Sequence, residues 1–225
     1  MLALGYPWRV TDRERLFDAW APSYDGDVAG SEGFPFEGYE GTLAEVARVV
    51  LEEGGGRVLE LGVGTGAVTK RLVEAGCEGW GIDVSGAMLE RARGRVPGAR
   101  LYRADVLGEW PAEMAGMRFD RIVSTYLFHE LSDARKVELV GALVERWLVP
   151  GGAIVVGDVA FASRVELERQ RALWRERWDE DEHYWAMDEI TPSLAGLGLG
   201  VSFDSTSFCA GVMVLRCAGD PGSGS

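Results

Sequence analysis

An apolar run that ends in an acid and then a glycine-rich turn is the part of this chain best suited to cofactor chemistry. Val58-Leu59-Glu60-Leu61 leads into Gly62-Val63-Gly64-Thr65-Gly66. Glycine has no Cβ, so this turn can bring backbone close to a ligand. Two more acids follow, Asp83 in Gly81-Ile82-Asp83-Val84-Ser85 and Asp105 in Ala104-Asp105-Val106. Because a carboxylate can accept both hydroxyl protons of a ribose, the pattern indicates a site for a nucleoside-containing cofactor.

Alternating strands and helices are predicted to position these residues. We expect a helix capped by Thr42 and Glu45 and ended by Gly54-Gly55-Gly56, and a helix from Ser85 to Pro97. Hydrophobic periodicity predicts further helices at 67–75 and 133–147. Short apolar runs predict strands at 58–61, 80–83, 99–104, 119–125 and 153–156.

Such alternation predicts an α/β fold with a doubly wound, parallel sheet. In this class, ligands bind beyond the carboxyl ends of the strands. Glu60, Asp83, Asp105, Thr125 and Asp158 are all predicted at those ends. Their convergence is stronger support for a cofactor site than any single motif.

The remainder of the chain changes pattern after Asp158. A capping box of Ser163 and Glu166 predicts a long helix over 163–178, and a short helix is expected at 193–197. The segments 201–207 and 211–216 predict a terminal antiparallel pair.

The motifs, in this order, resemble those of the class I S-adenosylmethionine-dependent methyltransferases. The resemblance implies a mostly parallel, seven-stranded Rossmann-like sheet with an antiparallel last strand and an N-terminal helical lid. It also implies that Glu60 faces the methionine ammonium, Asp83 the ribose and Asp105 the adenine amino group, with the Val106 amide on the ring. The cofactor-binding set implied is Trp20, Tyr24, Glu60, Gly62, Gly64, Thr65, Gly66, Asp83, Val84, Met88, Asp105, Val106 and Thr125.

The segment Trp20-Ala21-Pro22-Ser23-Tyr24-Asp25 resembles the lid element of small-molecule methyltransferases. By that resemblance, Trp20 and Tyr24 would cover the methionine end, whereas the simpler alternative is that Phe17 and Trp20 only anchor a helix. Phe34, Phe36 and Tyr39 are assigned to the same mobile cover. We expect one domain over 1–218, with the lid at 1–41, a helical substrate-side insertion at 159–192 and a flexible tail at 219–225.

Methyl transfer is an in-line displacement that chiefly requires alignment, so it leaves few sequence signals. A general base is needed only where the acceptor must lose a proton. His129 and Asp158 are the predicted catalytic candidates. The alternatives are that His129 holds a loop by hydrogen bonding and that Asp158 caps a helix; Tyr126 could contact substrate or simply pack.

Two features of the predicted insertion bear on the acceptor. Trp174 and Trp178 are spaced to share a helical face, so with Tyr184 and Trp185 they could form an aromatic wall or ordinary core. The acidic run Asp179-Glu180-Asp181-Glu182 could attract a cationic acceptor, although such runs usually form a solvated surface.

The composition of the chain argues against several classes of binding partner. The formal net charge of −13 in 225 residues opposes nucleic-acid binding. Three cysteines without a Cys-x-x-Cys pair predict neither disulfides nor a metal site. No apolar run approaches the about 20 residues of a membrane span, and no signal core is evident near Met1, so we expect a soluble cytoplasmic protein. A small-molecule acceptor is the default, and monomer and homodimer both stay open.

Two other functions fit part of the pattern. Gly62-x-Gly64-x-x-Ala67 also satisfies the dinucleotide fingerprint, with Asp83 as its ribose acid, which would make an NAD-dependent oxidoreductase. Glu60 near a pyrophosphate and an unused Asp105 argue against it. A non-catalytic protein that binds S-adenosylmethionine or S-adenosylhomocysteine would carry the same cofactor residues.

Overall fold

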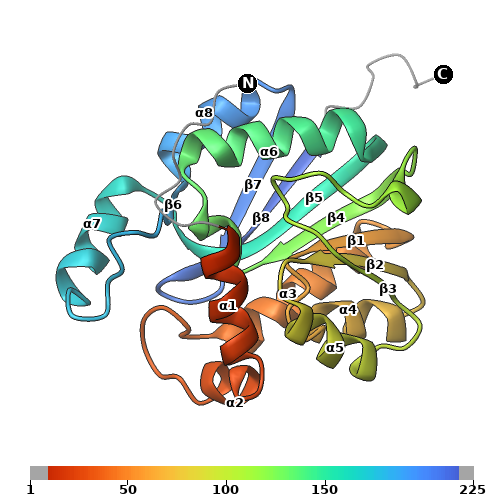
Figure 1. The fold of residues 1–225 in the computed structure, drawn as a ribbon. Coiled ribbons are helices and arrows are strands. Elements are labelled where there is room, and N and C mark those ends of the chain that lie inside the picture. The colour runs from red at the N-terminus through yellow and green to blue at the C-terminus, as the bar shows by residue number, and fades with distance from the viewer. Residues whose placement is uncertain (1–9, 218–225) are drawn as a thin grey trace.

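A twisted β-sheet forms the centre of the molecule (Figure 1), in a computed structural model that describes residues 10–217, with side chains from Asp12 onward. The strand order is β3-β2-β1-β4-β5-β8-β7, and the two-residue β6 pairs with β5. The first five strands along this path are parallel, and β8 is antiparallel to both of its neighbours. The strands are β1 Arg57–Leu61, β2 Glu78–Asp83, β3 Arg100–Arg103, β4 Phe119–Thr125, β5 Leu148–Phe161, β6 Trp185–Ala186, β7 Leu199–Ser205 and β8 Ala210–Cys217.

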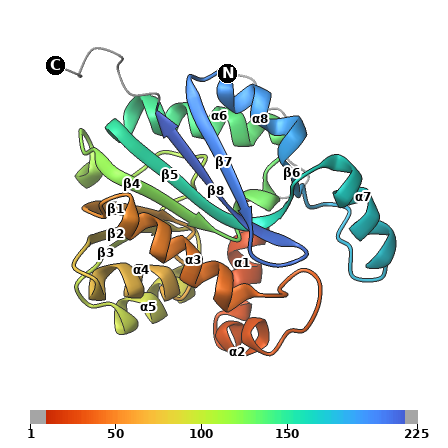
Figure 2. The same cartoon turned by 180° about the vertical axis from the view of Figure 1, so that it is seen from behind.

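Helices cover both faces of the sheet. Figures 1 and 2 show α3, α4 and α5 on one side and α6 and α8 on the other, while α7 projects from the end of the molecule. The helices are α1 Val10–Trp20, α2 Tyr24–Ala29, α3 Tyr39–Glu52, α4 Ala67–Glu74, α5 Gly86–Arg95, α6 Asp133–Arg146, α7 Arg164–Leu173 and α8 Met187–Ala195, with short 3-10 turns η1 Ala112–Met114 and η2 Phe128–Glu130. The predicted doubly wound α/β fold is confirmed.

Alternate residues of the central strands point into two separate cores. Val58 and Val123 pack with α3 and α4, whereas their neighbours Leu59 and Ile122 pack with α6 and α8. Since both faces are covered, the buried positions of the central strands are mostly apolar, as expected for a parallel sheet. Because these strands are buried on both faces, the positions of their ends, which carry the acidic residues, are fixed.

The predicted lid contains helices α1 and α2, followed by a non-helical segment over 30–38. Helices α1 and α2 lie at the carboxyl end of the parallel strands, so that Phe17 and Tyr24 come close to Thr125 at the end of β4. Residues 1–9 of the lid and the whole predicted tail, 219–225, lie outside the described residues. Among residues 10–217, the structure has no helix long and apolar enough to cross a bilayer.

The predicted start of α3 and the predicted end of α7 are wrong. Helix α3 begins at Tyr39, after Gly38 in a left-handed conformation, so Thr42 lies inside the helix and its hydroxyl donates to the Gly38 carbonyl. Glu45 binds Arg48 instead of completing a capping box. Helix α7 starts as predicted, because Ser163 accepts from the Glu166 N–H, but it ends at Leu173, five residues early.

Other differences concern the segments after β4. Strand β5 continues to Phe161, so Asp158 lies within the strand, where pairing with β8 extends the ladder. Helix α8 begins six residues before the predicted 193. Sequence patterns missed β6 because two residues carry no periodicity.

Candidate active site

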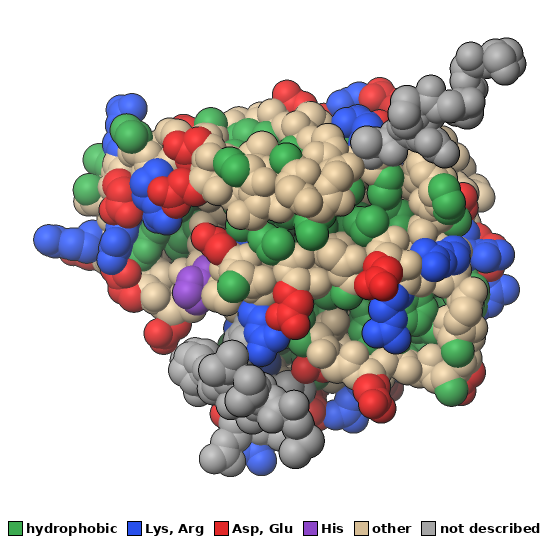
Figure 3. All heavy atoms as spheres, turned by 90° about the horizontal axis from the view of Figure 1, so that it is seen from above, with side chains coloured by type: hydrophobic (Ala, Val, Ile, Leu, Met, Phe, Trp, Pro, Cys, Tyr) green, Lys and Arg blue, Asp and Glu red, His purple; other side chains and the backbone are tan. Residues whose placement is uncertain are grey.

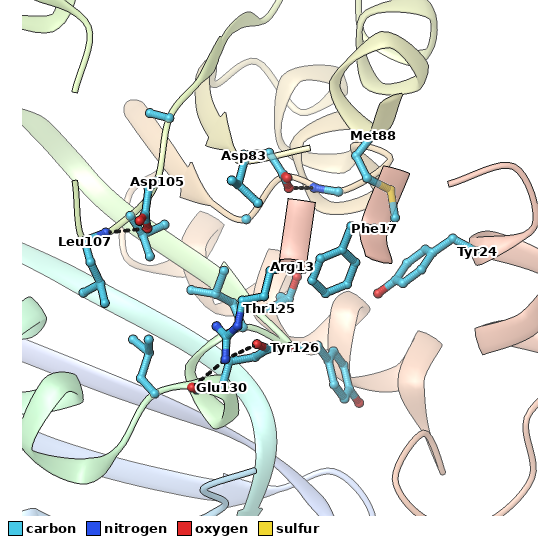
Figure 4. Close-up of a pocket in the computed structure, with 17 residues that line it drawn as sticks. Arg13, Phe17, Tyr24, Asp83, Met88, Asp105, Leu107, Thr125, Tyr126 and Glu130 are labelled. Atoms are coloured by element: carbon cyan, nitrogen blue, oxygen red, sulfur yellow. Dashed lines mark hydrogen bonds and ion pairs between the residues drawn. The ribbon is translucent and has the colours of Figure 1, made fainter. Parts of the chain in front are cut away.

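A cavity of about 220 Å³ opens at the carboxyl ends of the parallel strands, beneath the lid helices (Figure 4). It is bordered by nine predicted cofactor residues: Tyr24, Gly62, Gly64, Asp83, Val84, Met88, Asp105, Val106 and Thr125. A smaller adjoining space, about 20 Å³, adds Glu60 and Thr65 and shares Tyr24, Gly62, Gly64 and Thr125 with the main cavity. The fold therefore brings together all but two of the predicted set.

The glycine turn after β1 needs glycine for different reasons at each position. Gly62, Gly64 and Gly66 all have positive φ, at 70°, 54° and 84°. A Cβ on Gly62 would lie 2.6 Å from Leu127 Cδ1, and one on Gly66 would lie 3.1 Å from Ala92 Cβ. A Cβ on Gly64 would meet nothing within 4 Å. Gly66 is thus a packing residue that borders neither space, and Gly64 is the glycine whose missing side chain leaves open room at the cavity.

Asp83, the last residue of β2, is held rigidly at the cavity wall. Its Oδ2 accepts from the Gly64 N–H at 2.8 Å and its Oδ1 from the Ser85 N–H at 2.8 Å. Burial raises the pKa of Asp83, while these backbone donors oppose that rise. Each carboxylate oxygen keeps a further lone pair, so Asp83 can accept two hydrogen bonds from a ligand.

Glu60 is 2% exposed and faces the smaller space. Burial raises its pKa to about 8, although the Thr69 hydroxyl donates to it. A nearly buried carboxyl group with a single side-chain donor is an unusual arrangement. It suits a site that receives a cation.

The opposite end of the cavity combines apolar side chains with one acid. Asp105 follows β3 and accepts from the Leu107 N–H at 3.0 Å. Val84, Met88 and Val106 also line the cavity. An apolar slot with an acceptor at its edge fits a flat ring that carries an amino group.

Trp20 lies outside both spaces. Its indole Nε1 donates to Asp27 at 2.7 Å, and its ring packs edge-on against Tyr24 with centroids 4.7 Å apart. Tyr24 itself points into the cavity (Figure 4). Trp20 therefore supports Tyr24 from behind.

Polar contacts tie the lid to the cofactor loops. Asp18 accepts from the Ser85 hydroxyl at 2.6 Å and from the Ala87 N–H at 3.1 Å. Asp25 accepts from the Thr65 hydroxyl and pairs with Arg95. The residues that hold the lid thus neighbour those that line the cavity.

The two predicted catalytic residues meet each other but do not line the cavity. Asp158 accepts from the His129 N–H at 2.9 Å and from His129 Nδ1 at 2.6 Å. It also accepts from the Val159 N–H and, at 3.3 Å, from Trp185 Nε1, and it is fully buried. Burial alone would lower the pKa of His129, but the carboxylates of Asp158, Glu182 and Glu130 raise it to about 9.

Tyr126 is strained where it enters the cavity wall. Its φ of 49° is the one positive value among the described non-glycine residues, and its buried hydroxyl has no hydrogen-bond partner. Such strain is found mainly where a site requires it. Tyr126 lies across the cavity from Asp83 (Figure 4).

The predicted aromatic wall is not assembled at the cavity. Because α7 ends at Leu173, Trp174 stacks on Phe208 and Trp178 stacks on Phe34, at centroid distances of 5.4 and 4.9 Å. Phe34 is 2% exposed and belongs to the core with Tyr184. In the acidic run, Glu180 pairs with Arg171, whereas Glu182 lies beside His129.

Besides Ala104 and Leu107 near the end of β3, sequence reasoning missed five residues that line the cavity. They come from the lid helix α1 and from the segment after β4. The signal was present for the first group, since Arg13 and Phe17 are spaced four apart on one helical face. The missed residues are Arg13, Phe17, Leu127, Glu130 and Leu131.

Comparison with known proteins identifies relatives along most of the chain. Residues 58–152 match the family model described as a methyltransferase domain. An uncharacterized methyltransferase of Anoxybacillus flavithermus is 40% identical over 198 residues, which cover 84% of this chain and 90% of the relative. One from Geobacillus kaustophilus is 36% identical, with coverage of 84% and 89%.

Solved structures share the fold at low sequence identity. The magnesium protoporphyrin IX methyltransferase of Synechocystis, solved with bound SAH, superposes with a TM-score of 0.71 at 15% identity, covering 93% of this chain and 100% of that one. A complex of DhpI with SAM and HEP gives a TM-score of 0.70 at 20% identity, with coverage of 94% and 99%.

Proposed function

The chain belongs to the class I S-adenosylmethionine-dependent methyltransferases, and from that premise we propose that it transfers the methyl group to a small-molecule acceptor by in-line displacement in the cavity beneath α1 and α2. The observation that carries the proposal is the Asp83 carboxylate, fixed by two backbone N–H groups at the cavity wall. When bound, the cofactor supplies an electrophilic methyl carbon on a sulfonium. The residues of this chain have to hold that group, align it and exclude water.

The residues that border the two spaces match the chemical groups of the cofactor from one end to the other. Asp83 would accept the ribose hydroxyls, and Asp105 would accept the adenine amino group while Val84, Met88 and Val106 contact the ring. Glu60 and Thr65 border the space next to Gly64, where the methionine part would lie. A Cβ at Gly64 would project into this seat, which supports a ligand in van der Waals contact with the turn.

A small acceptor is supported by the enclosure of the cavity. Phe17 and Tyr24 of the lid close one side, and Tyr126 and Glu130 close another. The DhpI structure that shares this fold holds HEP beside SAM. On the face of the described chain in Figure 3, Lys and Arg side chains are spread among acidic ones, which does not suit a polyanionic substrate. The cytoplasmic location stays a prediction.

We assign His129 and Asp158 to positioning of the cavity wall. Asp158 binds both the backbone and the ring of His129, and thereby holds the segment that carries Tyr126, Leu127 and Glu130. Neither side chain borders the cavity, so the proposed transfer depends on alignment instead of a base from this pair. The single domain, its lid at 1–41 and its substrate-side insertion at 159–192 are parts of the same proposal.

Calorimetric titration of S-adenosylmethionine, S-adenosylhomocysteine and NADH into wild type and Asp83→Ala tests the donor site. We expect the first two ligands to bind wild type, NADH to give no heat, and the variant to lose binding. Binding of NADH alone would overturn the proposal in favour of an oxidoreductase. Transfer of radiolabelled methyl to a panel of small acceptors then separates an enzyme from a non-catalytic binder, which would bind the cofactor and never turn over.

A further inference from the structure

Three metal-ligating side chains meet at the edge of the cavity that faces away from the cofactor residues. His129, Glu130 and Glu182 each place one ligand atom within 4.8 Å of the other two. His129 and Glu130 come from η2 after β4, and Glu182 comes from the segment between α7 and β6. Glu130 also lines the cavity, so the cluster touches the proposed acceptor side.

The imidazole of His129 is oriented for a ligand at its second nitrogen. Asp158 occupies Nδ1 at 2.6 Å, and His129 is only 8% exposed. Nε2 lies 3.7 Å from Glu182 Oε1, which is too far for a hydrogen bond. A histidine whose Nδ1 is bound to a carboxylate while Nε2 is directed outward is the usual arrangement of a metal-ligating histidine.

Glu182 is brought to His129 by a rigid clamp on the residues that follow it. The His183 N–H donates to the His129 carbonyl at 2.6 Å. The fully buried Lys136 donates to the His183 carbonyl and lies 4.6 Å from the centroid of the Trp185 ring. Trp185 in turn donates to Asp158. The carboxylate that meets His129 is therefore fixed by the fold and is not one of several mobile side chains of an acidic loop.

Charge at the cluster favours a cation. Asp158, Glu130 and Glu182 surround one imidazole, and Arg13 binds the backbone carbonyl and Oε2 of Glu130. A metal ion at this cluster would therefore share the Glu130 carboxylate with the groups that it already contacts, Arg13 among them.

We propose that His129 Nε2, Glu130 and Glu182 bind one divalent transition-metal ion, of the Zn²⁺ or Mn²⁺ class, beside the acceptor side of the cavity. One imidazole nitrogen with two carboxylates suits these ions, whereas Mg²⁺ prefers oxygen ligands alone. Three protein ligands leave a coordination position open for water or for an oxygen of a bound molecule. The site goes beyond the proposed methyl transfer, which does not require it.

Metal binding to the full chain tests this site directly. Chelator-treated protein is titrated with Zn²⁺ in the calorimeter and with Co²⁺ in the spectrophotometer, where the position and intensity of the visible d–d band distinguish protein-bound Co²⁺ from the hydrated ion. We expect one equivalent of Zn²⁺ to bind. Glu182→Gln should weaken this binding about 10- to 100-fold and alter the Co²⁺ band.

Asp181→Asn is the matched control, because Asp181 belongs to the same acidic run, is exposed and lies outside the cluster. It should bind Zn²⁺ as wild type does. Equal binding by Glu182→Gln and Asp181→Asn would assign the metal to the acidic surface and overturn the site. Tighter binding of Mg²⁺ than of Zn²⁺, or no stoichiometric binding, would also overturn it. His129→Gln, with its folding checked by circular dichroism, supplies a second variant that must lose the band of protein-bound Co²⁺.

Discussion

The carboxylate of Asp83 accepts a hydrogen bond from the backbone N–H of Gly64 at 2.8 Å. This bond links the end of β2 to the glycine turn after β1, so one acid both shapes the turn and faces the cavity. Its other oxygen accepts from the N–H of Ser85, the N-cap residue that precedes α5. Asp83 therefore has a structural role and a proposed ligand role that can be separated by experiment.

Asp83→Asn should weaken S-adenosylmethionine binding about 10- to 100-fold. The amide keeps the size of the side chain but loses the charge that strengthens hydrogen bonds to ribose hydroxyls, an effect of about 1.5–3 kcal/mol. Calorimetry at constant pH measures the change. Asp204→Asn, a change in the edge strand β7, should leave affinity unaltered, and equal affinities in all three proteins would contradict the ribose assignment.

Gly64→Ala should weaken cofactor binding by more than the backbone strain of an alanine at positive φ explains. Gly64 and Gly76 both have positive φ, 54° and 97°, and a Cβ at either would meet nothing within 4 Å. An alanine at each position should cost about 1–2 kcal/mol of unfolding free energy, measured by urea denaturation. Only Gly64 borders the cavity, so only Gly64→Ala should raise the Kd for the cofactor. A parallel loss in Gly76→Ala would show that turn strain alone is responsible.

The sheet and the cofactor end of the site could be predicted because their signals are local. Buried parallel strands are short apolar runs, and the residues at their carboxyl ends follow directly in sequence, as Glu60, Asp83 and Thr125 do. Strand β4 and the start of α6 lie where their patterns predict. The capping box predicted at Thr42 is wrong because α3 begins earlier, at Tyr39, after Gly38 in a left-handed conformation.

The rest of the site depends on contacts distant in sequence. The ring of Trp174 stacks on Phe208, and that of Trp178 contacts Phe34 as well as the predicted Tyr184, so helical spacing missed one partner of each. Glu182 reaches His129 only through the clamp on His183, which no spacing rule contains. The positions of the residues on the acceptor side depend on such tertiary contacts, which sequence patterns do not predict.

Lys136→Met should lower the free energy of unfolding by about 1–3 kcal/mol without changing the Kd for the cofactor. The change leaves the buried His183 carbonyl without its ammonium donor, and such an orphaned acceptor carries that cost. Lys70→Met is the matched control, since Lys70 is half-exposed and lies 3.7 Å from Glu74, a surface pair worth at most about 1 kcal/mol. Urea denaturation measures the free energy of unfolding of both variants. Equal losses would show that the Lys136 hydrogen bond to the His183 carbonyl does not stabilise the fold.

Asp18→Asn should loosen the lid with little effect on global stability. The Asp18 carboxylate binds Ser85 and Ala87, and the Ser85 hydrogen bond is the main reason that its pKa is lowered. Hydrogen exchange of residues 10–29, with and without S-adenosylhomocysteine, should be faster in the variant, and the KM for the cofactor should rise. The exposed Arg15 offers a control in Arg15→Ala. Unchanged exchange in Asp18→Asn would show that the lid is held by other contacts.

Cofactor binding should release a proton from Glu60 below about pH 8. Burial raises the pKa of Glu60 from 4.5 to about 8, so the folded protein carries this group protonated at neutral pH. A cationic ammonium placed beside it favours the carboxylate, and the proton then leaves. Calorimetry in buffers of different ionisation enthalpy should give different binding heats at pH 7 and converging heats above pH 8, with the difference abolished in Glu60→Gln. Identical heats in all buffers at pH 7 would contradict the assignment.

The same shift fixes the sign of a stability effect in the cofactor-free protein. Because the folded state holds the Glu60 proton more tightly than the unfolded state, this group makes unfolding easier as pH rises from about 4.5 to 8 and adds no further slope outside that window. Glu60→Gln removes the ionisation, so the variant should gain stability relative to wild type progressively across this range. Thermal melts of both proteins over that pH series measure the difference, and a constant difference would show that Glu60 is already ionised in the folded state.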